Sequence, residues 1–82
     1  MKIEVFGPGC AKCNQSKATA EAFLASHQIA GEVVKHTDLA TMTARGVLRT
    51  PTTMIDGQPV VEGRVLRETD LEKWLAAHGG RA

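Results

Sequence analysis

The feature that most constrains the fold is a pair of cysteines, Cys10 and Cys13, placed directly after a short β-rich run and a glycine-proline-glycine break. Residues 2–6 have the composition of a strand. From about Cys10 to His27 helix formers dominate, and small or apolar residues recur at a spacing of three and four. These positions are Cys13, Ser16, Ala20, Phe23, Leu24 and His27. The pattern predicts a strand, a tight turn and a helix that begins at the first cysteine.

The remaining sequence continues this alternation. Residues 32–36 read as a second strand, so a right-handed β-α-β unit with parallel strands is expected. Thr37 or Asp38 is suited to cap a short helix that runs to about Arg45 and stops at Gly46. Two further strands, 52–55 and 59–62, flank Asp56-Gly57, the strongest short hairpin signal, and are expected to be antiparallel.

A last helix is predicted to open with a capping box in which Thr69 is the N-cap and Glu72 reaches back to it. This helix is expected to continue through Leu71, Trp74 and Leu75 to Gly79. The predicted order is therefore β-α-β-α-β-β-α, an α/β fold.

Length and charge limit the alternatives. A chain of 82 residues supports one domain, predicted over residues 1–78, with a frayed tail at 79–82. The net charge of +1 comes from Lys and Arg residues spread along the chain, so binding to nucleic acid or a membrane surface is not expected. No stretch resembles a signal peptide or a membrane span, and a cytoplasmic monomer is expected. Two cysteines three positions apart close too small a loop to stabilise the whole fold.

The cysteines are therefore interpreted as chemical groups. At a helix N-terminus Cys10 is stabilised as a thiolate, which favours it as the nucleophile. Cys13, one turn further into the helix, suits attack on the mixed disulfide that Cys10 forms. Lys12 either adds favourable charge or faces water. Residues 7–9 turn the backbone sharply and leave Cys10 uncovered.

Two other functions use the same thiols. A soft-metal chaperone would bind Cu(I), or Zn(II) with two more ligands. However, His27, His36 and His78 are scattered singly without ligand spacing, and the predicted fold ends on a helix, whereas copper-carrying ferredoxin-like domains end on a strand. A redox-sensing binding module, in which oxidation of the pair changes an interface, is the other alternative.

Thr50-Pro51 lies at the start of the third strand. A proline there is either an ordinary strand-start residue or the site of a cis peptide, since X-Pro is the junction at which the cis form is accessible.

Together, Cys10-Ala11-Lys12-Cys13 after the first strand, Thr50-Pro51 before the third and Asp56-Gly57 in the hairpin resemble the thioredoxin-like superfamily over almost the whole chain. Within that superfamily the chain most resembles the short prokaryotic thioredoxin/glutaredoxin-like proteins, and this resemblance implies a four-stranded mixed sheet flanked by three helices. The resemblance also implies a cis Thr50-Pro51 peptide that packs against the cysteines and offers main-chain hydrogen bonds to substrate.

The resemblance further implies a thiol–disulfide oxidoreductase that works in electron transport and redox homeostasis without a cofactor. The chain lacks the Gly-Gly and acidic pair with which glutaredoxins hold glutathione, so protein disulfides are the expected substrates, with a reductase that the sequence does not identify.

Four other side chains are weighed for the site. Glu4 lies at the offset where thioredoxins carry a buried acid that moves the resolving cysteine's proton, but an acid in a short strand is more commonly exposed. His36 and Arg49 either approach the site or lie on the surface, and Trp74 is expected in the core. None of the four is placed in the catalytic set.

Overall fold

The computed structural model describes residues 1–8 and 11–78. The elements follow the predicted order. They are β1 (Lys2–Phe6), α1 (Ala11–Ser26), β2 (Glu32–His36), α2 (Leu39–Ala44), β3 (Thr52–Ile55), β4 (Gln58–Glu62) and α3 (Glu68–Ala77). The order β-α-β-α-β-β-α predicted from the sequence is confirmed.

The four strands form one mixed sheet in the order β2-β1-β3-β4. β1 pairs in parallel with β2, and Phe6 lies opposite His36. β3 runs antiparallel to both β1 and β4. The central strand β1 is thus enclosed on both sides, and its C-terminal end leads directly to α1.

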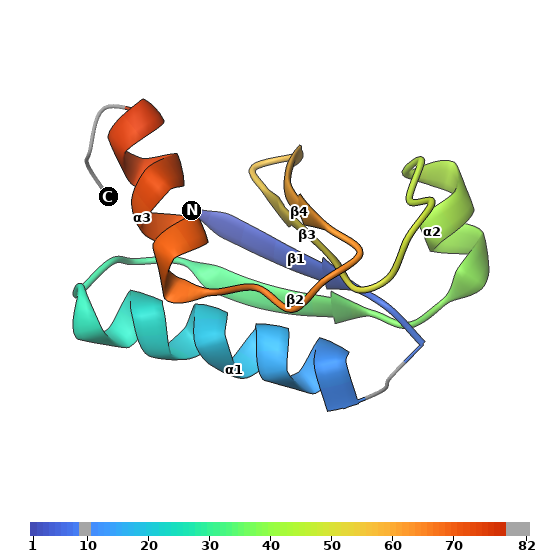
Figure 1. The fold of residues 1–82 in the computed structure, drawn as a ribbon, viewed down its shortest axis with the longest axis horizontal. Coiled ribbons are helices and arrows are strands. Elements are labelled where there is room, and N and C mark those ends of the chain that lie inside the picture. The colour runs from blue at the N-terminus through green and yellow to red at the C-terminus, as the bar shows by residue number, and fades with distance from the viewer. Residues whose placement is uncertain (9–10, 79–82) are drawn as a thin grey trace.

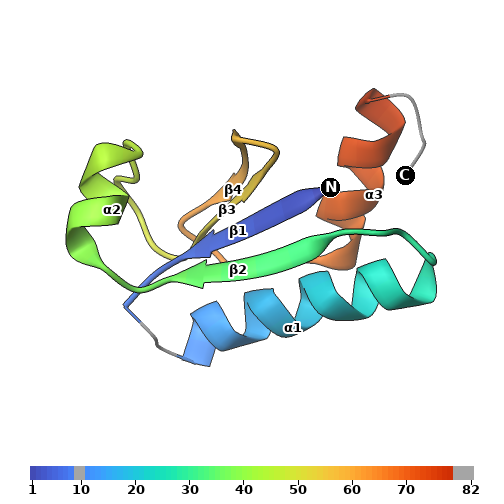
Figure 2. The ribbon, with the colours of Figure 1, turned by 180° about the vertical axis from the view of Figure 1, so that it is seen from behind.

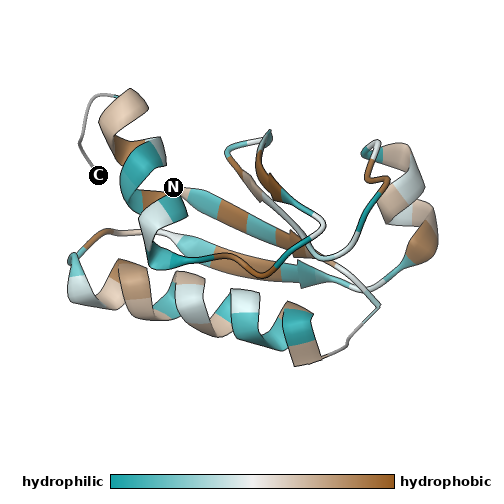
Figure 3. Cartoon of the chain, viewed as in Figure 1, coloured by the Kyte–Doolittle hydropathy of each residue, from teal (hydrophilic) through white to brown (hydrophobic). Residues whose placement is uncertain are grey.

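The sheet has two unequal faces. Ile3 of β1 packs with Phe23 of α1 and Leu71 of α3 in the larger core cluster. Figure 1 shows α1 running back along the sheet from the end at which β1 and β2 finish, and Figure 2 shows the same arrangement from behind. The alternating hydrophobic and hydrophilic bands of β1 in Figure 3 follow from the period of two along a strand.

The opposite face carries a smaller cluster of Phe6, Met42 and Met54. The short helix α2 contributes Met42 to this cluster and lies at the end of the sheet where β1 and β2 finish (Figure 1). The face toward α1 and α3 therefore carries most of the apolar core. Among the described residues, the face toward α2 carries only the smaller cluster.

The ends of α2 agree with the sequence prediction. Asp38 is the N-cap, and its side chain accepts a hydrogen bond from the main-chain N–H of Thr41 at 2.9 Å. Gly46 follows the C-cap residue Arg45 with φ of 73°, the left-handed conformation that favours glycine.

The predicted cap of α3 is wrong. Arg67 is the N-cap residue, and the carboxylate of Asp70 accepts a hydrogen bond from the Arg67 main-chain N–H at 2.9 Å. Thr69 and Glu72 lie inside the helix and do not form the capping box predicted for them. Asp70 also accepts two hydrogen bonds from Arg64, which lies before the helix.

Two polar contacts between distant segments fix the sheet and helices together. Asp56, in the hairpin turn, accepts a hydrogen bond from the main-chain N–H of Lys2 at the start of β1. Ser16, buried in α1, accepts one from Leu66 N–H at 3.0 Å. The second contact ties α1 to the segment that leads into α3.

Within residues 1–8 and 11–78, no helix has both the length and the apolar character required to cross a membrane.

Candidate active site

Cys13 lies in the first turns of α1 and is completely buried. Its Sγ atom approaches the main chain of Gly7 so closely that a Cβ on Gly7 would overlap with it. Gly7 follows β1, and its N–H donates to the carbonyl of His36 at 3.0 Å, so the strand ladder continues through it. The second cysteine is therefore held against the end of the central strand.

The Thr50–Pro51 peptide bond is cis. The Cβ of Thr50 lies 3.9 Å from the position that a Cβ on Gly7 would occupy, so the Thr50–Pro51 segment reaches the same point as Cys13. Two segments that are about forty residues apart in the sequence thus meet at the N-terminal end of α1.

The main chain around this proline is firmly held except at Thr50. The carbonyl of Pro51 accepts a hydrogen bond from Gly63 N–H at 2.9 Å, and the carbonyl of Arg49 accepts one from the Thr52 hydroxyl. Thr50 is exposed, and no hydrogen bond to its main chain occurs within the described part of the chain. Its N–H and C=O are therefore open to a partner.

Other residues singled out from the sequence take different places. Cys10 lies outside the described residues, and α1 begins at the following residue, Ala11. Lys12 is exposed on α1. The side chain of Arg49 lies beside Gly63, where its Cδ would be 3.1 Å from an added Cβ. Trp74 is half-buried against the larger core cluster and stacks on His78.

Glu4 is buried, so the interpretation as an exposed strand residue is wrong. Arg45 donates two hydrogen bonds to its carboxylate, at 2.9 and 2.8 Å, and His36 Nε2 donates a third at 2.9 Å. The His36 ring stacks on Phe6, and the Arg45 guanidinium lies 5.2 Å from the centre of the same ring. We call Glu4, His36, Arg45 and Phe6 the Glu4 cluster.

This cluster lies on the face of the sheet away from Cys13. Side chains alternate along β1, so Glu4 and Phe6 share the α2 face, whereas Ile3 faces α1. His36 therefore approaches Glu4 and not the buried cysteine. No local pattern in the sequence signals the pairing, because Arg45 is 41 positions from Glu4.

The surroundings of Glu4 favour its charged form. The hydrogen bonds from Arg45 are the largest influence and, with the bond from His36, lower the pKa of Glu4 from 4.5 to about 2, although burial raises it. An ionised carboxylate accepts hydrogen bonds only, so His36 is the donor in its contact. The cluster is an ion pair that fastens β1 to the end of α2.

Among the residues that the structure describes, the histidines do not complete a metal site with Cys13. His36 is hydrogen-bonded to Glu4, and His78 contacts Trp74 O and Gln58. His27 follows the other end of α1, a helix of 16 residues and thus about 24 Å long. The prediction that His27 stands alone is wrong, because its ring lies within 4.8 Å of carboxylate oxygens of Glu68 and Glu72. All three residues are exposed.

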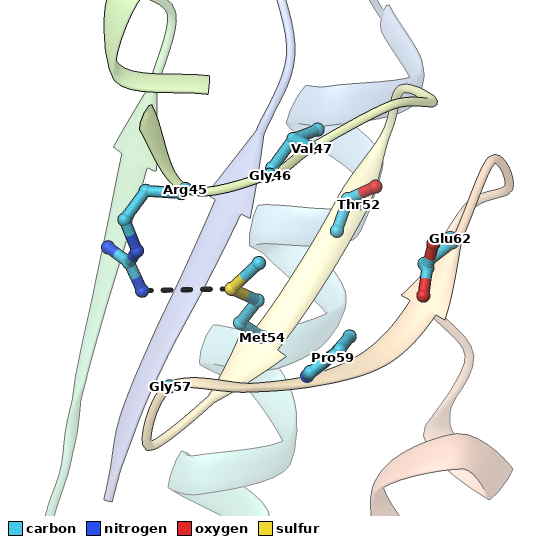
Figure 4. A pocket seen from close by; sticks show the side chains of 8 residues that line it. All are labelled: Arg45, Gly46, Val47, Thr52, Met54, Gly57, Pro59 and Glu62. Atoms are coloured by element: carbon cyan, nitrogen blue, oxygen red, sulfur yellow. Dashed lines mark hydrogen bonds between the residues drawn. The ribbon is translucent and has the colours of Figure 1, made fainter. Parts of the chain in front are cut away.

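A cavity of about 170 Å³ lies on the α2 face of the sheet. Figure 4 shows the Arg45 side chain pointing toward that of Met54, with Pro59 and Glu62 of β4 on the other side of Met54 from Arg45. Arg45 Nη2 also contacts Met54 Sδ at 3.6 Å. This cavity lies beside the Glu4 cluster, on the opposite face of the sheet from Cys13.

The sheet order, the helix that begins at the end of the central strand and the cis peptide before β3 define a thioredoxin-like α/β fold. Residues 1–76 match the family described as Thioredoxin domain, so the chain belongs to the thioredoxin family. The expected family and fold are thereby confirmed.

Two archaeal proteins named thioredoxin are similar over 76 residues. The one from Methanothermobacter thermautotrophicus is 28% identical, and the match covers 93% of this chain and 99% of the relative. The one from Methanocaldococcus jannaschii is 32% identical, with 93% and 87% covered. The structure of thioredoxin 1 from Thermosipho africanus superposes with a TM-score of 0.58 at 20% identity, over 96% of this chain and 99% of that one, which supports the fold.

Proposed function

We propose that the protein is a thiol–disulfide oxidoreductase that exchanges electrons with protein disulfides through Cys10 and Cys13. The observation that carries this proposal is the meeting of Cys13, Gly7 and Thr50 at the start of α1. Membership of the thioredoxin family supports the same chemistry. The position of Cys10 in the sequence, one residue before α1 begins, suits a thiolate stabilised by the helix N-terminus.

The reaction has two exchange steps. The Cys10 thiolate attacks one sulfur of the substrate disulfide, which breaks the substrate S–S bond, forms a Cys10–substrate disulfide and releases the first substrate thiolate, which takes up a proton. Cys13, deprotonated, then attacks the Cys10 sulfur and releases the second substrate thiolate. The substrate gains two electrons and two protons, and the Cys10–Cys13 pair is oxidised to a disulfide. A dithiol reductase restores the pair.

Thr50 and Pro51 are proposed to bind the substrate. The N–H and C=O of Thr50 make no hydrogen bond within residues 1–8 and 11–78, and they are suited to pair with an extended segment that carries the target disulfide. The bonds at Arg49 O and Pro51 O hold the segment on either side of Thr50 in place. The substrate backbone would then lie beside the cysteine pair, with its disulfide in reach of Cys10.

Trapping the mixed disulfide tests the proposal. In Cys13→Ser the second step is blocked, so a covalent complex with a disulfide-bearing protein is expected to accumulate. Dithiothreitol is expected to reduce its mixed disulfide and separate the two proteins. The matched control, Cys10→Ser/Cys13→Ser, is expected to form none. A wild-type protein that fails to reduce a model disulfide, together with a Cys13→Ser variant that captures nothing, would refute the proposal.

A further inference from the structure

We propose that Gly7 is a positioning residue for Cys13: the missing Cβ provides the space in which the buried sulfur lies. The inference deepens the proposed function, and it rests on that function only in giving Cys13 the second step. The supporting observation is that a Cβ on residue 7 would overlap with the Sγ of Cys13. Any residue other than glycine would occupy the same space as the sulfur.

The backbone conformation does not explain this glycine. Gly46, Gly57 and Gly63 have φ values of 73°, 83° and 81°, in the left-handed region. Gly7 is not among the described glycines with positive φ, so its backbone angles do not exclude other residues. The sequence suggests that Gly7 serves the turn after β1, but the structure shows a steric requirement set by Cys13.

An alanine methyl group at residue 7 would overlap only with the Sγ of Cys13 among the described atoms near it. The Cβ of Cys13 would remain 3.4 Å from the new methyl group, and Thr50 Cβ 3.9 Å, both ordinary contacts. The main chain of Gly7 is held by its hydrogen bond to His36 O. Cys13 Cα is fixed within α1. The direct relief is therefore a rotation of the Cys13 side chain about χ1, which moves the sulfur out of its buried position.

Burial of this sulfur has a chemical consequence. Cys13 is fully buried, so we expect its sulfur to be shielded from reagents in solution and to exchange with a sulfur presented at the start of α1. A rotated Cys13 would lose that protection. Gly7 thus helps to reserve the Cys13 thiol for attack on the Cys10–substrate disulfide.

A double-mutant cycle measures the contact. We compare wild type, Gly7→Ala, Cys13→Ala and the double variant by urea unfolding with a reductant present. Gly7→Ala is expected to lower the folding equilibrium constant by at least about 10-fold when Cys13 is present. In the Cys13→Ala background the same change is expected to cost less than about 3-fold, because the overlapping atom is gone.

Gly46→Ala is the matched control. No heavy atom lies within 4 Å of its added Cβ, so its cost comes from the backbone and is expected to be the same in the wild-type and the Cys13→Ala backgrounds. If Gly7→Ala fails to fold but the double variant folds, the contact is demonstrated. Equal costs of Gly7→Ala in both backgrounds, or failure of both to fold, would overturn the inference.

Alkylation separates positioning from simple destabilisation. In a Cys10→Ser background, Gly7→Ala is expected to raise the iodoacetamide rate of Cys13 at least about 10-fold above the rate that its globally unfolded fraction accounts for. A rate fully explained by global unfolding would overturn the positioning role. Both experiments are independent of disulfide reductase activity, so a failed inference and a failed proposed function are distinguishable.

Discussion

At the scale of single residues, the buried Glu4 carboxylate makes stability depend on pH. Its folded-state pKa is about 2 instead of 4.5, so its stabilising contribution is fully present above pH 4.5 and is lost as the pH falls through about 2. The difference between these values corresponds to at most about 3 kcal/mol. We expect the urea midpoint to fall over this range, and to fall less steeply in Glu4→Gln.

Glu21→Gln is the control for this titration. Glu21 is exposed and lies 3.9 Å from Lys17 at a helical spacing of four, where an ion pair contributes about 0.3–0.5 kcal/mol. The Glu21→Gln variant should leave the dependence of the urea midpoint on acid pH essentially unchanged. An identical pH dependence in Glu4→Gln and wild type would contradict the assignment of the acid sensitivity to Glu4.

Gly63 gives a second prediction at this scale. It has a positive φ, its N–H donates a hydrogen bond to Pro51 O, and a Cβ added to it would lie 3.1 Å from Arg49 Cδ. Gly57 has a similar φ but open space around it. Both Ala variants should lose about 1–2 kcal/mol of unfolding free energy through backbone strain.

Because its Cβ would also crowd Arg49, Gly63→Ala is expected to lose more stability than Gly57→Ala and to slow disulfide reduction. Denaturation curves and initial rates with a model disulfide check this. Equal stability and equal rates for the two variants would show that contact with the Thr50–Pro51 segment is unimportant.

At the scale of elements, two side chains, Asp70 and Thr69, can be compared as the cap of α3. The Asp70 carboxylate accepts from Arg67 N–H and from Arg64, and Arg64 lowers the pKa of Asp70. Asp70→Ala should therefore cost about 1–2 kcal/mol, whereas Thr69→Ala should cost less than about 0.5 kcal/mol. Chemical denaturation at neutral pH measures both. A larger loss of stability in Thr69→Ala than in Asp70→Ala would support Thr69 as the cap, as the sequence predicts.

Local patterns predicted the elements well, and contacts between elements less well. The β-rich run at residues 2–6, the Asp38 cap and the Asp56-Gly57 turn are encoded by neighbouring residues, and each agrees with the structure. The burial of Glu4 depends on Arg45, brought to it by the fold. The close approach of Gly7 and Cys13 likewise depends on how α1 packs on the sheet, which no local spacing encodes.

At the scale of the whole molecule, the two faces of the sheet should differ in local stability. α2 has six residues, and Met42 is the one buried side chain among them. Met42 belongs to the smaller cluster, and the Arg45–Glu4 ion pair ties the end of α2 to β1. β1 and β3, by contrast, lie in the middle of the sheet. α2 can therefore open while the larger cluster stays packed.

Native-state hydrogen exchange measures this difference. We expect the amides of α2 to exchange at least about 100-fold faster than those of β1, through an opening that exposes little surface and so depends weakly on urea. Arg45→Ala should speed exchange in α2 beyond its effect on global stability, because it removes the tie to Glu4. If α2 and β1 exchanged together, with the urea dependence of global unfolding, the smaller cluster would be part of one cooperative core and the loss of Arg45 would weaken both faces equally.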